Sequence, residues 1–262
     1  MKPVLLLVLA FSLVLAGCVA GKSVMPPAEP VGFLSPDAAL SAIRYDRNRE
    51  RVFQVTAKVA LSYPTRKMVF KLAVSMQSPD KLRMESIPVL GPPDFFLTVK
   101  EGRFKVFLPG APEFIMGNSG PDNLGRFLPL TWSAEKWISV LTGTHPGTAG
   151  QAVQIRGTMD GPFYRVEVMS GETIRESLWV DPKNRRLEKA DFISTDGRKN
   201  QVSYRWGLQS DNFEMPEIIK IEPGDGSRIV ITCSDFRAVK DAGSDLFDLS
   251  LPGEGIPIRN WD

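Results

Sequence analysis

An alternating pattern of side chains runs through Phe53-Gln54-Val55-Thr56-Ala57-Lys58-Val59-Ala60-Leu61-Ser62. Apolar residues occupy every second position, and most of the positions between them are polar. Residues 68–76 repeat the pattern, with Met68, Phe70, Leu72, Val74 and Met76 as the apolar set. Because successive side chains of a strand point to opposite faces of a sheet, a period of two predicts two long strands, each with one apolar face.

Shorter alternating segments follow along the chain. They predict strands at residues 81–87, 95–100, 103–108 and 113–116, and then at 152–157, 163–169, 172–180, 186–194, 201–206, 217–222 and 228–236. The dipeptides Asp160-Gly161, Asp196-Gly197 and Asp225-Gly226 are typical of the tight turns that join antiparallel strands. The sequence therefore predicts a largely antiparallel meander.

Helix signals are few. Ser35 is a good N-cap and Pro36 suits the first helical position, so we expect a helix from there to about Asn48. A second helix is expected between Ser133 as the N-cap and Gly143 as the terminator. A large sheet with an apolar face and few helices favours a mainly β (α+β) domain, in which a curved antiparallel sheet wraps around two or three helices.

The composition excludes several functional classes. The chain has 262 residues, 32 basic and 30 acidic, and a formal net charge of +2, so it lacks the positive excess of a nucleic-acid binder. Its single histidine and two cysteines are too few for a zinc site of several His and Cys ligands, an iron–sulfur cluster or a disulfide framework. No cofactor and no metal are expected.

The N-terminus carries a targeting signal. Lys2 precedes an apolar run over residues 4–15, which is too short for the ~20 residues of a membrane-spanning helix. The next tetrapeptide, Leu15-Ala16-Gly17-Cys18, resembles the lipobox of bacterial lipoproteins. That resemblance implies a signal peptide at 1–17, cleavage before Cys18, and diacylglyceryl and acyl chains such as palmitate on Cys18. Val19 in place of an aspartate implies sorting to the outer membrane.

Residues 18–34 are rich in proline and glycine and lack a period, so they predict a flexible tether. The folded domain is then expected at residues 35–262. It would hang from the outer membrane by its lipid anchor and face the periplasm.

The sequence offers little enzyme chemistry, and the chain is not expected to be an enzyme. His145 stands in a turn context, and a role as a base or pH switch is one hypothesis for it. Carboxylate pairs such as Glu172 with Glu176 are expected by chance among 30 acidic residues. Cys233 lies in an apolar strand and is expected to be a reduced core thiol.

One loop and one sheet face stand out. The segment Ile87-Pro88-Val89-Leu90-Gly91-Pro92-Pro93-Asp94 joins two predicted strands yet presents Val89 and Leu90 between prolines, which indicates a contact surface. The face that carries Phe70, Met76 and Met84 is flexible and polarisable enough to close around apolar ligands. The alternative is that these residues simply form the core.

Several of these motifs resemble the outer-membrane lipoprotein receptor LolB and its LolA-like relatives. The similar stretches are Ile87-Pro88-Val89-Leu90-Gly91, Leu128-Pro129-Leu130 followed by Trp137-Ile138, Leu141, Gly143 and Pro146-Gly147, and the closing Leu246-Phe247-Asp248-Leu249-Ser250-Leu251-Pro252-Gly253. The chain is longer than that receptor, its loop has more prolines, and residues 253–262 have no counterpart in it.

The resemblance implies an open antiparallel half-barrel whose concave face receives acyl chains beneath helices. Val89 and Leu90 would form a membrane-insertion loop. The expected acyl-chain groove comprises Phe70, Leu72, Val74, Met76, Leu82, Met84, Phe95, Leu97, Trp137 and Leu141.

The functional hypothesis is lipoprotein or lipid trafficking to the outer membrane by a monomer that binds acyl chains and a periplasmic carrier protein. The alternative is a non-catalytic structural or assembly lipoprotein whose groove binds a protein partner in the cell envelope.

We predict that Cys18→Ala releases the protein from the membrane as a folded periplasmic form, because acyl chains on Cys18 would be the anchor. Membrane fractionation measures this, with Ser23→Ala in the tether as the matched control that stays attached. A Cys18→Ala protein that remains firmly in the membrane fraction would contradict the lipobox interpretation.

Overall fold

The computed structural model describes residues 33, 35–44, 50–147, 153–194, 196–240, 242–243, 245–251, 253 and 255–261. All of them belong to the compact unit Gly32–Asp262. The predicted signal peptide, Cys18 and nearly all of the predicted tether lie outside the described residues. The predicted start of the domain at residue 35 falls within this unit.

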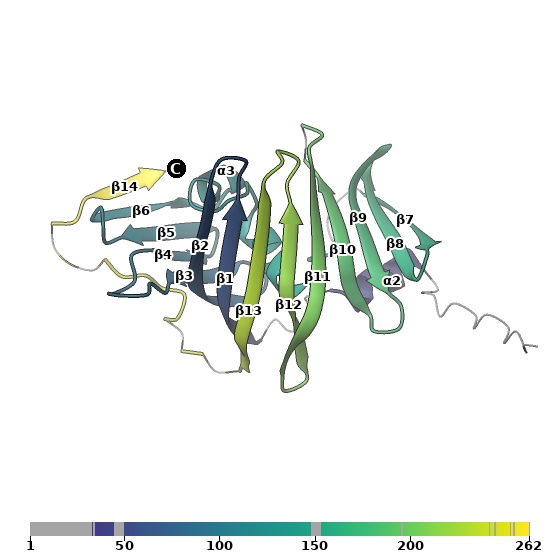
Figure 1. The fold of residues 1–262 in the computed structure, drawn as a ribbon, viewed down its shortest axis with the longest axis horizontal. Helices are drawn as coiled ribbons and strands as arrows, with labels where there is room; N and C mark the ends of the chain where they lie inside the picture. Colours follow the sequence, from purple (N-terminus) through teal and green to yellow (C-terminus); the bar gives the residue numbers. More distant parts are fainter. Residues whose placement is uncertain are drawn as a thin grey trace, which may run out of the picture. The chain divides into compact units, whose positions relative to one another are not determined.

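One 14-stranded sheet accounts for every strand in the described part of the chain. The strands are β1 (Val52–Ser62), β2 (Lys67–Gln77), β3 (Lys81–Ser86), β4 (Phe96–Lys100), β5 (Arg103–Leu108), β6 (Glu113–Asn118), β7 (Gln154–Asp160), β8 (Phe163–Ser170), β9 (Thr173–Asp181), β10 (Arg186–Ile193), β11 (Lys199–Ser210), β12 (Phe213–Glu222), β13 (Arg228–Val239) and β14 (Ile258–Trp261). Their order is β14-β6-β5-β4-β3-β2-β1-β13-β12-β11-β10-β9-β8-β7. The sheet is open: β14 and β7 are its two edge strands, and they are not paired with each other (Figure 1).

The predicted antiparallel meander is confirmed, and one pair of strands makes it a single sheet. Neighbouring strands are joined in chain order from β1 to β6 and from β7 to β13. The two series meet where β1 pairs with β13, with Ala57 opposite Cys233 and Val59 opposite Ile231. The alternating pattern of β1 is real: its burial alternates along most of the strand, and its apolar face lies in the core.

Several features of the sheet were not predicted; among them, β11 runs four residues beyond the expected 201–206, to Ser210. β14 lies parallel to β6 in the C-terminal extension, where Ile258 pairs with Phe114; four residues are too few to show a period. β12 begins at Phe213 rather than near residue 217, because Pro216 is accommodated within the strand at a register irregularity opposite Trp206. A proline cannot donate to the ladder, so such irregularities are where sheets tolerate it.

Three helices occur among the described residues: α2 (Pro36–Ala42), α3 (Pro121–Leu124) and α4 (Ala134–Thr142). The expected helix from Ser35 to about Asn48 is wrong in length. α2 has the predicted Ser35 cap but ends at Ala42, since Arg44 forms a β-bridge with His145 and the N–H of His145 donates to the carbonyl of Ile43 at 2.9 Å. Residues 45–49 are outside the described part.

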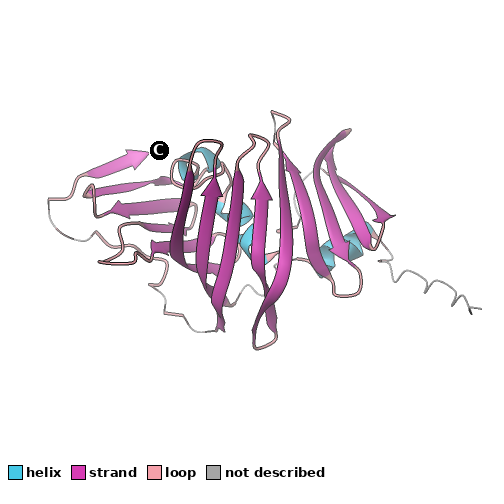
Figure 2. Cartoon of the chain, in the orientation of Figure 1, coloured by secondary structure: helices cyan, strands magenta, loops and turns pink. Residues whose placement is uncertain are grey.

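Helix α4 matches its prediction at both ends. The Ser133 hydroxyl accepts from the N–H of Lys136, and Gly143 ends the helix with a φ of 65°. The helices, cyan in Figure 2, accompany the sheet on its inner side, where α4 contacts β3 and β12 and α2 contacts β7 and β8. The mainly β class with a sheet around two or three helices is confirmed.

We expect Gly143→Ala to lower the free energy of unfolding by about 2–3 kcal/mol. An alanine in the left-handed backbone conformation costs ~1–2 kcal/mol, and its Cβ would also stand 2.7 Å from the Trp206 ring. Gly161→Ala is the matched control, since Gly161 also has a positive φ but nothing within 4 Å of a Cβ. Thermal unfolding followed by circular dichroism separates the two, at ~2–4 °C per kcal/mol. Equal shifts would contradict the contact with Trp206.

Candidate apolar binding cavity

A cavity of about 270 Å³ lies between helix α4 and the inner face of the sheet. Its walls come from β1, β2, β3, β13, α4, the loop before β4 and the segment between α3 and α4. The lining residues are Ala57, Val59, Phe70, Leu72, Val74, Met84, Ser86, Asp94, Phe95, Phe127, Leu128, Pro129, Trp137, Leu141, Ile229 and Ile231. Its volume is just below the ~300–1,000 Å³ of typical small-molecule sites.

The polar lining residues, Ser86 and Asp94, already bond to each other. The Ser86 hydroxyl donates to Oδ1 of Asp94 at 2.6 Å and accepts from the backbone N–H groups of Asp94 and Phe95 at 2.9 and 3.1 Å. These bonds join the end of β3 to the start of β4 at the cavity wall. The other lining side chains are apolar except for the indole N–H of Trp137, which is buried without a hydrogen-bond partner, so the wall as a whole suits an apolar ligand.

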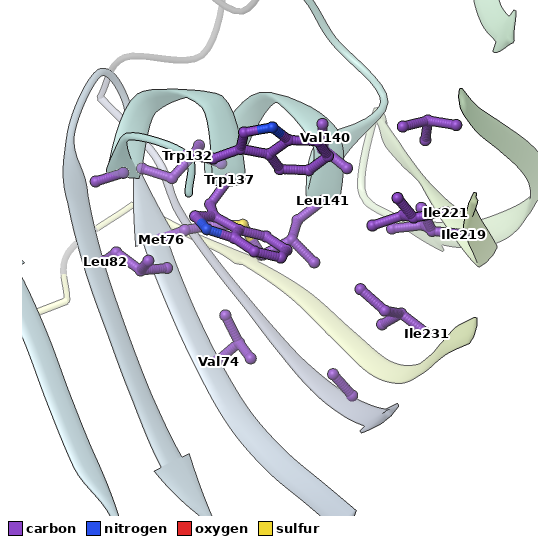
Figure 3. Packing of buried hydrophobic residues seen from close by; sticks show 14 of the residues in the cluster. Val74, Met76, Leu82, Trp132, Trp137, Val140, Leu141, Ile219, Ile221 and Ile231 are labelled. Atoms are coloured by element: carbon purple, nitrogen blue, oxygen red, sulfur yellow. The ribbon is translucent and has the colours of Figure 1, made fainter. Parts of the chain in front are cut away.

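Aromatic contacts hold α4 over the cavity. Trp137 and Leu141 project from α4 toward the sheet side chains, which include Val74 and Ile231 (Figure 3). The Trp137 ring lies 5.0 Å from the Trp132 ring, centroid to centroid, and Trp132 meets Phe192 edge to face at 6.0 Å. Such pairs contribute ~0.5–1.5 kcal/mol each beyond the burial of their area. The helix therefore forms a fixed cover on this side.

The structure brings most of the predicted groove residues together. Phe70, Leu72, Val74, Met84, Phe95, Trp137 and Leu141 all line the cavity. Met76, Leu82 and Leu97 do not line it; they are 0% exposed and belong to the surrounding core. The groove and the plain core, which the sequence left as alternatives, thus share one sheet face.

Other wall residues were missed by the sequence prediction. Ala57 and Val59 had the same alternating signal as β2, so their strand pattern could have suggested them. Ile229 and Ile231 reach the cavity only because β13 pairs with β1, and no local pattern reports that pairing. Phe127, Leu128 and Pro129 come from a segment without regular structure.

The loop that follows β3 is exposed at its tip. Val89 is 99% exposed and Leu90 90% exposed, and Ile87 at the base is exposed as well. Gly91 follows with a φ of 88°. Because Ser86, Asp94 and Phe95 line the cavity, the two ends of this loop form part of the cavity wall. The apolar tip of the loop is separated from each end by only a few residues.

A second, polar cluster lies beside α4. Glu176 on β9 accepts from Lys136 Nζ at 2.8 Å and lies 2.6 Å from Nε2 of His145. Nδ1 of His145 accepts from the N–H of Gly147, so Nε2 carries the proton and donates to Glu176. Burial opposes the charge of Glu176, but Lys136 and the His145 hydrogen bond together hold its pKa well below the ordinary value.

This cluster ties α4 and the following turn to β9 and leaves the His145 ring with both nitrogens bonded. Glu172, the other member of the carboxylate pair considered from the sequence, is exposed in the turn before β9. Cys233 is buried as predicted, and burial raises the pKa of its thiol to about 12, so it is an inert core residue.

Within the described ranges, no group of three or more His, Cys, Asp or Glu side chains is placed to hold a metal ion. No helix of the described residues is long and apolar enough to span a membrane.

The open, mainly antiparallel sheet with a helix over an apolar cavity forms a half-barrel, and comparison with solved structures identifies this fold. A LolA superfamily protein of Nitrosomonas europaea matches with a TM-score of 0.56 and 18% identity, over 83% of this chain and 99% of that one. A putative outer membrane lipoprotein-sorting protein domain of Vibrio parahaemolyticus matches with a TM-score of 0.55 and 13% identity, over 81% and 97%.

A DUF1329 family protein of Desulfovibrio piger is also similar, with a TM-score of 0.56 and 14% identity over 84% of this chain and 98% of that chain. The 262-residue chain therefore has a LolA-like fold, and the predicted resemblance is confirmed as far as the fold is concerned. No protein-family model matches the sequence, and no curated protein matches it significantly.

We expect Leu72→Asp and Met76→Asp to differ, although both residues are on the same face of β2. A carboxylate at Met76 has no access to water and should unfold the domain, since an unpaired buried charge costs several kcal/mol. At Leu72 the charge borders the cavity, so we expect a folded protein that no longer binds a fluorescent fatty acid. Melting curves and binding titrations measure both effects. Equal unfolding of the two variants would favour a filled core.

Proposed function

We propose that the protein is an outer-membrane-anchored lipoprotein that binds acyl chains in its apolar cavity and takes part in lipoprotein or lipid trafficking to the outer membrane. The mature domain would face the periplasm, held by acyl chains on Cys18. Acyl chains would reach it from a periplasmic carrier protein.

The observation that carries this proposal is the cavity. The wall is almost entirely aliphatic, aromatic and thioether groups and so offers burial to a hydrocarbon chain, while its one carboxylate, Asp94, is bonded to Ser86 at the loop end of the wall. Burying apolar surface yields roughly 25 cal/mol per Å². The fold supports the same direction, because similar half-barrels include a protein described as an outer membrane lipoprotein-sorting domain.

The exposed loop supplies the membrane contact in this proposal. Val89 and Leu90 are almost fully solvated, which is unfavourable for two adjacent large aliphatic residues unless they enter another apolar phase. Since the loop ends form part of the cavity wall, a tip inserted in a bilayer would bring the cavity close to the lipid surface.

The direct test is extraction of the purified Cys18→Ala protein followed by mass spectrometry of the organic phase. We expect a co-purifying molecule with an acyl chain, depleted in the Leu72→Asp variant. A folded protein that carries no lipid and takes up no fluorescent fatty acid would contradict acyl binding and favour the alternative, a structural or assembly lipoprotein with a protein partner.

We predict that Leu90→Glu leaves thermal stability within ~0.5 kcal/mol of the parent, because the side chain is exposed. Delivery of cargo to liposomes should fall at least about tenfold, since burying one leucine in an acyl phase is worth roughly 1.5–3 kcal/mol. The control is Ile258→Glu, which places the same charge on another exposed aliphatic at the edge strand β14. An unchanged delivery rate in a stable Leu90→Glu protein would remove the insertion role of the loop.

A further inference from the structure

Four basic residues cluster on the outer face and hairpin turn of β1 and β2, beside the apolar loop. Lys58, Lys67 and Lys71 alternate with the core residues of their strands, and Arg66 lies in the turn that joins them; all four are exposed. We call these residues the basic face. The net charge of the whole chain is only +2, so this positive charge is local.

The arrangement of the basic face is electrostatically unfavourable in the protein alone. Lys58 stands directly opposite Lys71 on the neighbouring strand, and like charges so placed destabilise a sheet. None of the four side chains forms an ion pair within the ranges that the structure describes. The carboxylates of the adjoining strand and loop, Glu85 and Asp94, bond to Arg83 and to Ser86 instead.

The basic face adjoins the apolar loop. The N–H of Ile87 donates to the carbonyl of Lys71 at 2.8 Å, so the loop starts beside Lys71. Val69, which is 62% exposed, lies between Lys67 and Lys71 on the same outer face. Exposed aliphatic side chains therefore adjoin lysines that form no ion pair in the described part of the chain.

We propose that this surface docks on a bilayer that contains anionic phospholipid. Aliphatic groups that enter the acyl region, flanked by lysine and arginine at headgroup level, match the two components of an anionic membrane surface. Negative lipid headgroups would also relieve the repulsion between Lys58 and Lys71. This inference rests on the proposed function and adds the lipid class that the membrane contact requires.

Binding of the Cys18→Ala protein to vesicles tests the proposal. We expect binding to vesicles of phosphatidylcholine with phosphatidylglycerol, weakened by added salt, and much weaker binding to vesicles of phosphatidylcholine alone. Each basic residue near an anionic surface contributes about a fivefold increase in partitioning. The variant Lys58→Gln/Lys67→Gln/Lys71→Gln should therefore lose roughly 100-fold on the anionic vesicles.

The matched control removes three positive charges elsewhere. Arg156, Lys183 and Lys240 are exposed and form no ion pair in the described part of the chain; the first two lie on or beside β7 and β9, and Lys240 follows the opposite end of β13 from the β1–β2 turn. Arg156→Gln/Lys183→Gln/Lys240→Gln should keep most of the anionic binding. Equal losses in both triple variants would overturn the proposal, because net charge alone would then explain the binding.

Two further outcomes would also overturn it. Equal binding to both vesicle types would show that the loop inserts without help from the basic face. Binding to neither would indicate that another partner, such as an acidic protein, occupies this surface. Acyl binding in the cavity is measured separately by lipid extraction, so failure of the docking surface and failure of the proposed function are distinguishable.

Discussion

Helix α4 packs on the apolar inner face of the sheet, where it contacts β3 and β12, and this packing sets the position of the cavity. An open sheet of this length exposes a large apolar surface, and few helices are available to cover it. Trp137 and Leu141 cover part of that surface, and the cavity is the space that they and the segment 127–129 leave unfilled. The cavity therefore exists because few helices cover the apolar face of the sheet.

Polar interactions fix the position of that cover. Lys136 and His145, at the start of α4 and just after it, converge on Glu176 of β9, while the Gly143 cap packs against Trp206 of β11. These contacts are on the β9–β12 side, whereas the cavity lies on the β1–β3 side. The polar contacts of the helix and the apolar cavity beneath it are thus at different strands of the sheet.

The outer surface of β1, β2 and the loop after β3 lies over the same strands as the cavity. The residues that would meet a membrane come from β1, β2 and the loop after β3, the elements whose inner residues line the cavity. In a strand, alternate positions serve opposite faces, so Phe70 and Leu72 face the cavity while Val69 and Lys71 face outward. The β1–β2 hairpin therefore carries part of the cavity wall on its inner face and the basic face on its outer face.

Local sequence patterns are enough to locate most strands of this protein and both ends of α4. Period-two patterns predict the strands of both series, Ser133 and Gly143 mark the ends of α4, and two aliphatic residues between prolines single out the loop at Val89 and Leu90, because each of these signals depends on neighbouring residues only. Other features depend on contacts between distant parts of the chain. The pairing of β1 with β13 brings Ile229 and Ile231 to the cavity. Packing buries Met76 in the core and leaves Leu72 at the cavity wall. The bridge between Arg44 and His145 ends α2 early. These outcomes depend on contacts between residues far apart in the chain, whose free energy no local pattern records.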